Sequence, residues 1–126
     1  MRILIVDDSS IMRTMIKRVV VLAQVPVDDI LEAANGAEAL EILESRDVHL
    51  LLTDINMPVM TGVELLRELA DDNRWDNLTR VVISTDGSAC RQEEVAGLDV
   101  CRYLEKPFSP EIMRDVLSEV ARTART

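Results

Sequence analysis

Residues 3–8 read Ile-Leu-Ile-Val-Asp-Asp: four apolar side chains in a row, followed at once by two carboxylates. The same order returns in LLLTD at 50–54 and in VVISTD at 81–86. Short, continuous apolar runs predict strands that are buried on both faces, as in a parallel sheet. The polar residues after each run then lie at the carboxyl ends of the strands, where open parallel sheets bind their ligands.

Segments of helical period fill the intervals between these runs. Residues 30–34 and 100–105 read as two weaker strands, and 37–44, 63–70 and 110–122 read as helices. Segment 88–97 has only Val95 as a large apolar residue, so its helix has weak support and is expected to be mobile. This alternation predicts an α/β fold with a doubly wound, five-stranded parallel sheet and helices on both faces.

The helical periods also predict which side chains face the core. In the first helix the apolar stripe opposes Arg13, Lys17 and Arg18, and its members are Met12, Met15, Ile16, Val19 and Ala23. The inward residues of the later helices are Val63, Leu66, Leu69 and Ala70, then Ile112, Met113, Val116, Leu117 and Val120.

Composition bounds the class of protein. The 126 residues fit one domain, expected to span 1–126 without an output domain, and 48% apolar content excludes disorder. The longest apolar run, Val19–Ala23, is too short to cross a bilayer and no signal peptide is present, so a cytoplasmic protein is expected. A net charge of −9 disfavours nucleic-acid binding. A lone His49 and two distant cysteines, Cys90 and Cys101, exclude a His/Cys metal centre and a disulfide scaffold.

The predicted carboxyl edge of the sheet gathers three carboxylates, one hydroxyl and one ammonium, from Asp7, Asp8, Asp54, Ser84 and Lys106. The carboxylates and the lysine leave a charge of −2, which a hard divalent cation would neutralise, and Mg²⁺ prefers such oxygen ligands. Adding a phosphoryl group to one carboxylate would bring its charge to about −2, which a metal, a lysine and a hydroxyl could stabilise together. The edge therefore fits phosphoryl chemistry on an aspartate.

Each of these residues also has a purely structural interpretation. Asp7 and Asp8 could face the positive end of a helix that Ser9 or Ser10 caps. Asp54 could belong to a simple turn, Ser84 could be a satisfied hydroxyl, and Lys106 could be an ordinary surface lysine. Their joint position at strand ends favours the functional interpretation.

Four segments resemble the response-regulator receiver domain of two-component signalling, and the resemblance covers essentially the whole chain: ILIVDDSSIMR, LLTDINMPVMTGVELL, VVISTDGS and YLEKPFSPE. The resemblance implies a flavodoxin-like sheet of strand order 2-1-3-4-5. It also implies that Asp54 accepts a phosphoryl group from the phosphohistidine of a histidine kinase or a histidine phosphotransfer protein.

The resemblance assigns further roles to named residues. Mg²⁺ would be held by Asp7, Asp8, Asp54 and the backbone carbonyl of Asn56. Lys106 would contact the phosphoryl group and precede a cis-proline, Pro107; Ser84 would be the switch hydroxyl and Tyr103 its aromatic partner. Phosphoryl lifetime would depend on Asn56, Thr85 and Asp86. Two residues depart from the family pattern: Thr85 replaces a usual Ala or Gly, and Thr61 replaces a common Asp.

The expected function is a switch that catalyses only its own phosphorylation and dephosphorylation and signals by binding an unidentified downstream protein, without nucleic acid or membrane contact. Two alternatives remain: a phosphohydrolase that uses Asp54 as nucleophile, and an inactive pseudo-receiver that serves assembly. The first lacks a catalytic acid two residues later, where Asn56 stands. A flavin-binding protein of the same fold class is disfavoured, because Asp7 and Asp8 would meet the flavin phosphate. The cognate kinase and the pathway, chemotaxis or other, are not encoded in any motif.

Overall fold

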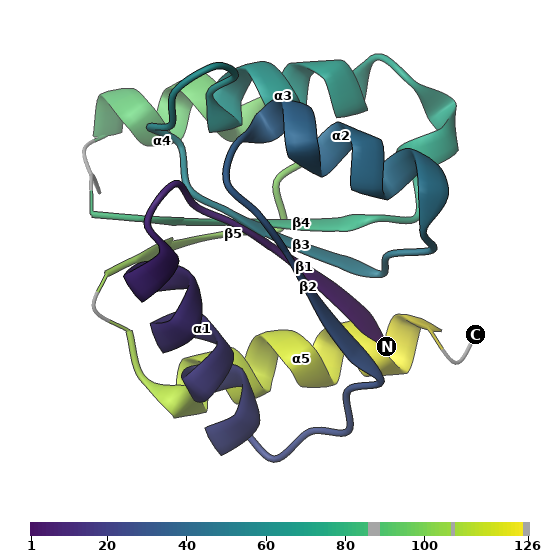
Figure 1. Ribbon diagram of the computed structural model, residues 1–126, viewed down its shortest axis with the longest axis vertical. Helices are drawn as coiled ribbons and strands as arrows, with labels where there is room; N and C mark the ends of the chain where they lie inside the picture. Colours follow the sequence, from purple (N-terminus) through teal and green to yellow (C-terminus); the bar gives the residue numbers. More distant parts are fainter. Residues whose placement is uncertain (86–88, 107, 125–126) are drawn as a thin grey trace.

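The computed structural model describes residues 1–85, 89–106 and 108–124 (Figure 1). Asp86 and Pro107 lie outside the described residues, so the roles predicted for them stay predictions. The elements follow the predicted alternation, with one extra 3-10 turn: β1 (Arg2–Val6), α1 (Ser10–Leu22), β2 (Asp29–Ala33), α2 (Gly36–Ser45), β3 (Leu50–Thr53), α3 (Gly62–Ala70), η1 (Asn73–Trp75), β4 (Thr79–Ser84), α4 (Ala89–Ala96), β5 (Arg102–Glu105) and α5 (Pro110–Ala124).

The five strands form one parallel sheet of order β2-β1-β3-β4-β5, which confirms the predicted fold. Helices α1 and α5 cover one face, and α2, α3 and α4 cover the other (Figure 1). Within β1, Ile3 and Ile5 join the apolar cluster under α1 and α5, whereas Leu4 and Val6 join the apolar cluster under α2, α3 and α4. A continuous apolar run is therefore what a strand covered on both faces requires.

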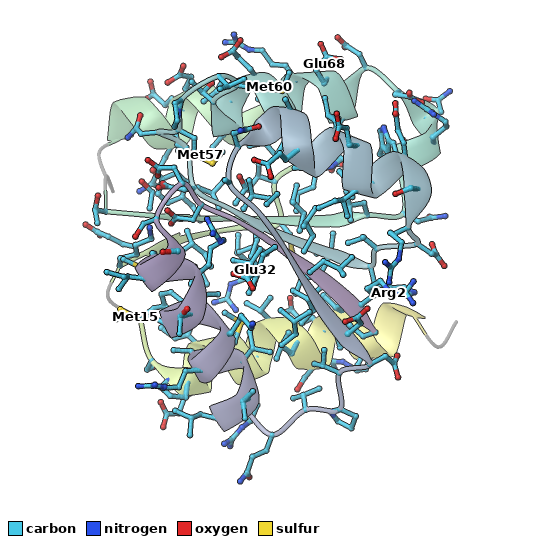
Figure 2. The ribbon with its side chains drawn as sticks, in the orientation of Figure 1. Arg2, Met15, Glu32, Met57, Met60 and Glu68 are labelled. Carbon is cyan, nitrogen blue, oxygen red and sulfur yellow. The ribbon has the colours of Figure 1, made fainter. Side chains whose placement is uncertain are left out.

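Two predicted core positions are wrong, and two buried residues were left out of the predicted core. Met15 is 54% exposed and Ala70 is exposed, whereas Val20 and Leu65 are buried. The apolar stripe of α1 is wider than the part that meets the sheet, so the helix buries Ile16 and Val20 and leaves Met15 outside (Figure 2). The weakly supported segment does form a helix, α4, and its only large apolar side chain, Val95, is 2% exposed.

Sheet hydrogen bonding continues one residue beyond three of the strands and fixes the backbone of the predicted site. Three amide-to-carbonyl bonds do this: Asp7 to Ala33 (3.1 Å), Asp54 to Val6 (2.9 Å) and Lys106 to Ser84 (2.8 Å). The three site residues thus begin at a common edge because their strands end there in register. Among the described residues, no helix is both long and apolar enough to span a membrane.

Candidate phosphorylation and metal site

Asp54 occupies the first position after β3, with its side chain only 15% exposed. One carboxylate oxygen, Oδ1, accepts a hydrogen bond from the amide of Ile55 at 2.7 Å. The carbonyl of Asp54 accepts the hydroxyl of Thr53 at 2.8 Å, and Thr53 itself is fully buried. These bonds hold both the backbone and one oxygen of Asp54, and they leave Oδ2 turned toward the rest of the site.

Asp7 is the most constrained residue of the site and is 2% exposed. Its Oδ1 accepts the amide of Ser9 at 2.9 Å, and its Oδ2 accepts the ammonium of Lys106 at 3.0 Å. Ser9 also caps α1, since its hydroxyl accepts the amide of Met12. The structural role predicted for this segment therefore coexists with its place in the site.

Lys106 joins the buried carboxylate of Asp7 to the half-buried carboxylate of Asp54. Its Nζ lies 3.0 Å from Oδ2 of Asp7 and 3.7 Å from Oδ2 of Asp54, and its side chain is 9% exposed. Burial raises the pKa of Asp54 above its ordinary value, and the negative charge of Asp7 raises it further. The Lys106 ammonium and the amide of Ile55 oppose this effect, so the carboxyl group sits in an environment that one lysine does not fully neutralise.

The three acidic side chains form a set that fits a divalent cation. Asp7, Asp8 and Asp54 each offer a carboxylate oxygen, and these atoms lie within 4.8 Å of one another. Asp8 is exposed, Asp54 is half-buried and Asp7 is buried, so the set opens to solvent on one side. Carboxylate oxygens beside open solvent suit Mg²⁺, which keeps several of its waters.

The loop after β3 is fixed by Gly62, which is not among the predicted site residues. A Cβ atom on Gly62 would lie 2.0 Å from the carbonyl oxygen of Asp54, and its amide donates to Ile55 at 2.7 Å. Only glycine allows α3 to begin this close to the backbone of Asp54. Thr61, one of the two departures from the family pattern, caps α3 in a reciprocal pair with Glu64. The substitution therefore preserves the capping function.

The other predicted residues within the described part of the chain are Ser84, Thr85, Asn56 and Tyr103. Ser84 ends β4 and is 1% exposed, whereas Thr85 and Asn56 are exposed. Tyr103, on β5, is half-buried and packs against the apolar cluster under α2, α3 and α4. The structure thus brings Asp7, Asp8, Asp54 and Lys106 into one cluster and leaves the predicted roles of the other residues as predictions.

Sequence reasoning missed two residues behind this cluster, Arg13 and Glu32. The sequence pattern places Arg13 opposite the core, but its side chain is only 17% exposed and donates to the carbonyl of Asp7 at 2.6 Å. Glu32 accepts from both Arg13 and Lys17. The signal was available: an acidic residue interrupts the apolar strand at 30–34, and two cations stand four residues apart in the preceding helix.

Comparison with known proteins agrees with this geometry. The family model of the response regulator receiver domain matches residues 3–118. A "Chemotaxis protein CheY homolog" of Campylobacter jejuni is 36% identical over 124 residues, covering 98% of this chain and 94% of the relative. The "Chemotaxis protein CheY1" of Helicobacter pylori strain J99 is 37% identical, covering 98% of each chain.

Solved structures show the same fold. The chemotaxis response regulator CheY4 of Vibrio cholerae superimposes with a TM-score of 0.80 at 28% identity, covering 94% of this chain and 97% of that one. The shared fold, the family match and the acidic cluster beside a lysine in this chain lead to one conclusion. The chain belongs to the receiver-domain family of CheY-type response regulators, the signalling switches of two-component systems.

Proposed function

We propose that this chain is a phosphorylation-controlled switch in which Asp54 accepts a phosphoryl group from the phosphohistidine of a histidine kinase or a histidine phosphotransfer protein. The observation that carries the proposal is the position of Lys106, whose ammonium lies within 4 Å of both Asp7 and Asp54. An acidic cluster alone would fit many ions, but a buried lysine shared between two aspartates also provides for the charge of a phosphoryl group. We expect this exchange to take place in the cytoplasm.

The chemistry follows from the two oxygens of Asp54. Because Oδ1 already accepts the amide of Ile55, Oδ2 is the nucleophile. Oδ2 forms the bond to phosphorus, the phosphorus–nitrogen bond of the phosphohistidine breaks, and the imidazole nitrogen keeps the electron pair and takes up a proton. Lys106 then contacts the phosphoryl oxygens, whose charge of about −2 exceeds that of the original carboxylate.

Mg²⁺ is the cofactor that fits this site. Asp7, Asp8 and Asp54 would hold it together with the backbone carbonyl of Asn56. Bound there, the ion would neutralise charge on the transferring phosphoryl oxygens. The chain's own contribution is to keep Asp54 partly dry and aligned, which the Ile55 and Thr53 hydrogen bonds do.

We propose that the output is a change in the surface formed by α4, β5 and α5, read by a downstream protein. Ser84 and Tyr103 lie on adjacent strands, so a movement of the hydroxyl toward a phosphoryl group can alter the packing of the ring. Val95 is the only large apolar residue in the sequence of α4, and it is buried, so we expect little packing energy to oppose displacement of this helix. With a net charge of −9 the partner is expected to be a protein rather than a nucleic acid.

The test is intact-mass measurement after incubation with Mg²⁺ and a small acyl-phosphate donor. Wild type should gain the mass of one phosphoryl group, and Asp54→Asn should gain none. Asp47→Asn, which removes a carboxylate outside the cluster, is the matched control and should behave as wild type. No gain by wild type in the presence of Mg²⁺ would favour the pseudo-receiver instead. Steady release of phosphate from an added phosphomonoester would favour the phosphohydrolase.

A further inference from the structure

Arg13 connects the acidic cluster to the far edge of the sheet. Its Nη1 donates to the backbone carbonyl of Asp7 at 2.6 Å, and its Nε donates to Oε1 of Glu32 at 3.0 Å. Glu32 belongs to the edge strand β2 and lies on the α1 side of the sheet (Figure 2). Its second oxygen accepts Lys17, one turn further along α1, at 3.1 Å.

These contacts complete the fixation of Asp7. Its amide donates to Ala33, its two carboxylate oxygens accept Ser9 and Lys106, and the guanidinium of Arg13 holds its carbonyl. The carbonyl bond is the only one of the four that comes from α1 itself. This bond therefore ties α1 to the backbone of Asp7 at the turn between β1 and α1, and so helps to fix the position of the adjacent Asp8.

A guanidinium suits this task because it is planar and donates in two directions at once. One direction serves Glu32 and the other serves Asp7, so neither partner can move without disturbing the other. A lysine ammonium at the same position would retain the charge but not the fixed fork. Charge-assisted hydrogen bonds of this length are among the stronger ones in proteins.

We propose that Arg13 is a positioning residue, which, braced by Glu32, holds Asp7 and Asp8 in the arrangement that binds the divalent cation. The inference rests on the proposed function, because the binding of Mg²⁺ at this site is part of that proposal. Residues that orient metal ligands in this way typically change metal affinity by about tenfold or more when they are removed.

Charge alone predicts the opposite effect of Arg13 on the affinity for Mg²⁺. Arg13 is a cation that contacts the backbone of Asp7, one of the proposed metal ligands, and a neighbouring positive charge repels Mg²⁺. If charge alone mattered, Arg13→Met would bind Mg²⁺ more tightly and Arg13→Lys would bind it as wild type does. If positioning dominates, both variants bind Mg²⁺ more weakly, because both lose the fork.

The experiment measures the Kd for Mg²⁺ by titration calorimetry in wild type, Arg13→Met, Arg13→Lys, Glu32→Gln and the control Lys17→Met. We expect the Kd of Arg13→Met to rise about tenfold, with a smaller rise in Arg13→Lys and Glu32→Gln. Lys17→Met breaks the other ion pair of Glu32 without reaching Asp7, so its Kd should stay near that of wild type. The backbone nitrogen shift of Asp8, which is bonded to the Asp7 carbonyl, should move in both Arg13 variants and not in Lys17→Met.

Three outcomes overturn the proposal: a tighter or unchanged Kd in Arg13→Met, a wild-type Kd in Arg13→Lys, or an equal loss of affinity in Lys17→Met. If Arg13→Met does not fold, Arg13→Lys and Glu32→Gln decide the question alone. The Mg²⁺ titration is independent of phosphorylation. Failure of wild type to accept a phosphoryl group would therefore contradict the proposed function while leaving the test of Arg13 intact.

Discussion

The three described glycines allow a graded test of how closely α3 approaches Asp54. A Cβ on Gly62 would lie 2.0 Å from the Asp54 carbonyl oxygen and 2.8 Å from Cα of Ile55, whereas ordinary contacts begin near 3.4 Å. At Gly36 the nearest atom, at 2.7 Å, belongs to the flexible side chain of Met60. At Gly97 nothing lies within 4 Å, and its φ is not positive.

The expected free energies of unfolding follow from these distances. Gly62→Ala requires backbone to move by more than 1 Å, so it should lose about 3 kcal/mol, the upper part of the range for overpacking. It also strains the Gly62 to Ile55 hydrogen bond, worth about 1 kcal/mol. Gly97→Ala should gain about 0.5 kcal/mol, because alanine lowers the entropy of the unfolded chain. Gly36→Ala should fall between them, because Met60 can rotate away.

The assay is urea unfolding in EDTA, with free energies obtained by linear extrapolation. A second measurement is the rate of phosphorylation by an acyl-phosphate donor, which should fall at least tenfold in Gly62→Ala, since small displacements of reacting groups are costly. Gly97→Ala should leave that rate unchanged. If the free energies of unfolding of Gly62→Ala and Gly97→Ala differ by less than about 0.5 kcal/mol, the close approach does not constrain the site and the reasoning is refuted.

Four further outcomes are expected. Asp8→Asn should raise stability in EDTA by relieving repulsion, and it should lose the gain of about 2.7 kcal/mol that Mg²⁺ gives wild type at a hundredfold excess over Kd; equal Mg²⁺ responses in thermal melts would contradict this. Lys106→Ala should lower the free energy of unfolding in EDTA by about 3 kcal/mol, because Asp7 and Asp54 lose their cationic partner. After phosphorylation, Lys106→Ala should show none of the chemical-shift changes that wild type shows in β5. Thr85→Ala should lose its phosphoryl group faster than wild type once the donor is removed, because a branched side chain obstructs water; equal or slower decay refutes this. Although partial burial of Glu32 acts the other way, hydrogen bonds from Lys17 and Arg13 lower its pKa. Glu32→Gln should therefore destabilise by up to about 1 kcal/mol above pH 4.5, and the difference should vanish as acid protonates the folded carboxyl.

The order of elements and the position of the site could be predicted because they depend on local patterns. Apolar runs that end in a carboxylate mark buried strands and their carboxyl ends, and the register of a parallel sheet then brings those ends together. The cluster of Asp7, Asp8, Asp54 and Lys106 follows from this alone. The switch roles predicted for Ser84 and Tyr103 depended on resemblance, since a hydroxyl at a strand end and an aromatic ring within a strand have many ordinary uses.

The features that were missed depend on distances between segments. Gly62 reads as an ordinary helix start, and only the structure shows that its Cα faces the Asp54 carbonyl. Arg80 directly precedes an apolar run and was not singled out by its sequence pattern, yet it is 2% exposed. Its guanidinium donates to the carbonyl of Trp75 at 2.8 Å and pairs with Asp99 at 3.2 Å. The periodicity of apolar residues predicts which face of an element a side chain occupies, but it does not show which polar group from another segment lies next to that face.

The two distances from Lys106 suggest why this site can act as a switch. Its ammonium is 3.0 Å from Asp7 and 3.7 Å from Asp54, so its principal partner in this structure is Asp7. The proposed phosphorylation would add about one negative charge at Asp54 and none at Asp7, which would favour Asp54 as the new principal partner. The shift needed is small and exchanges one charged contact for another, so it costs little. Because Lys106 directly follows β5, the strand that carries Tyr103, this exchange has a short route to the proposed output surface.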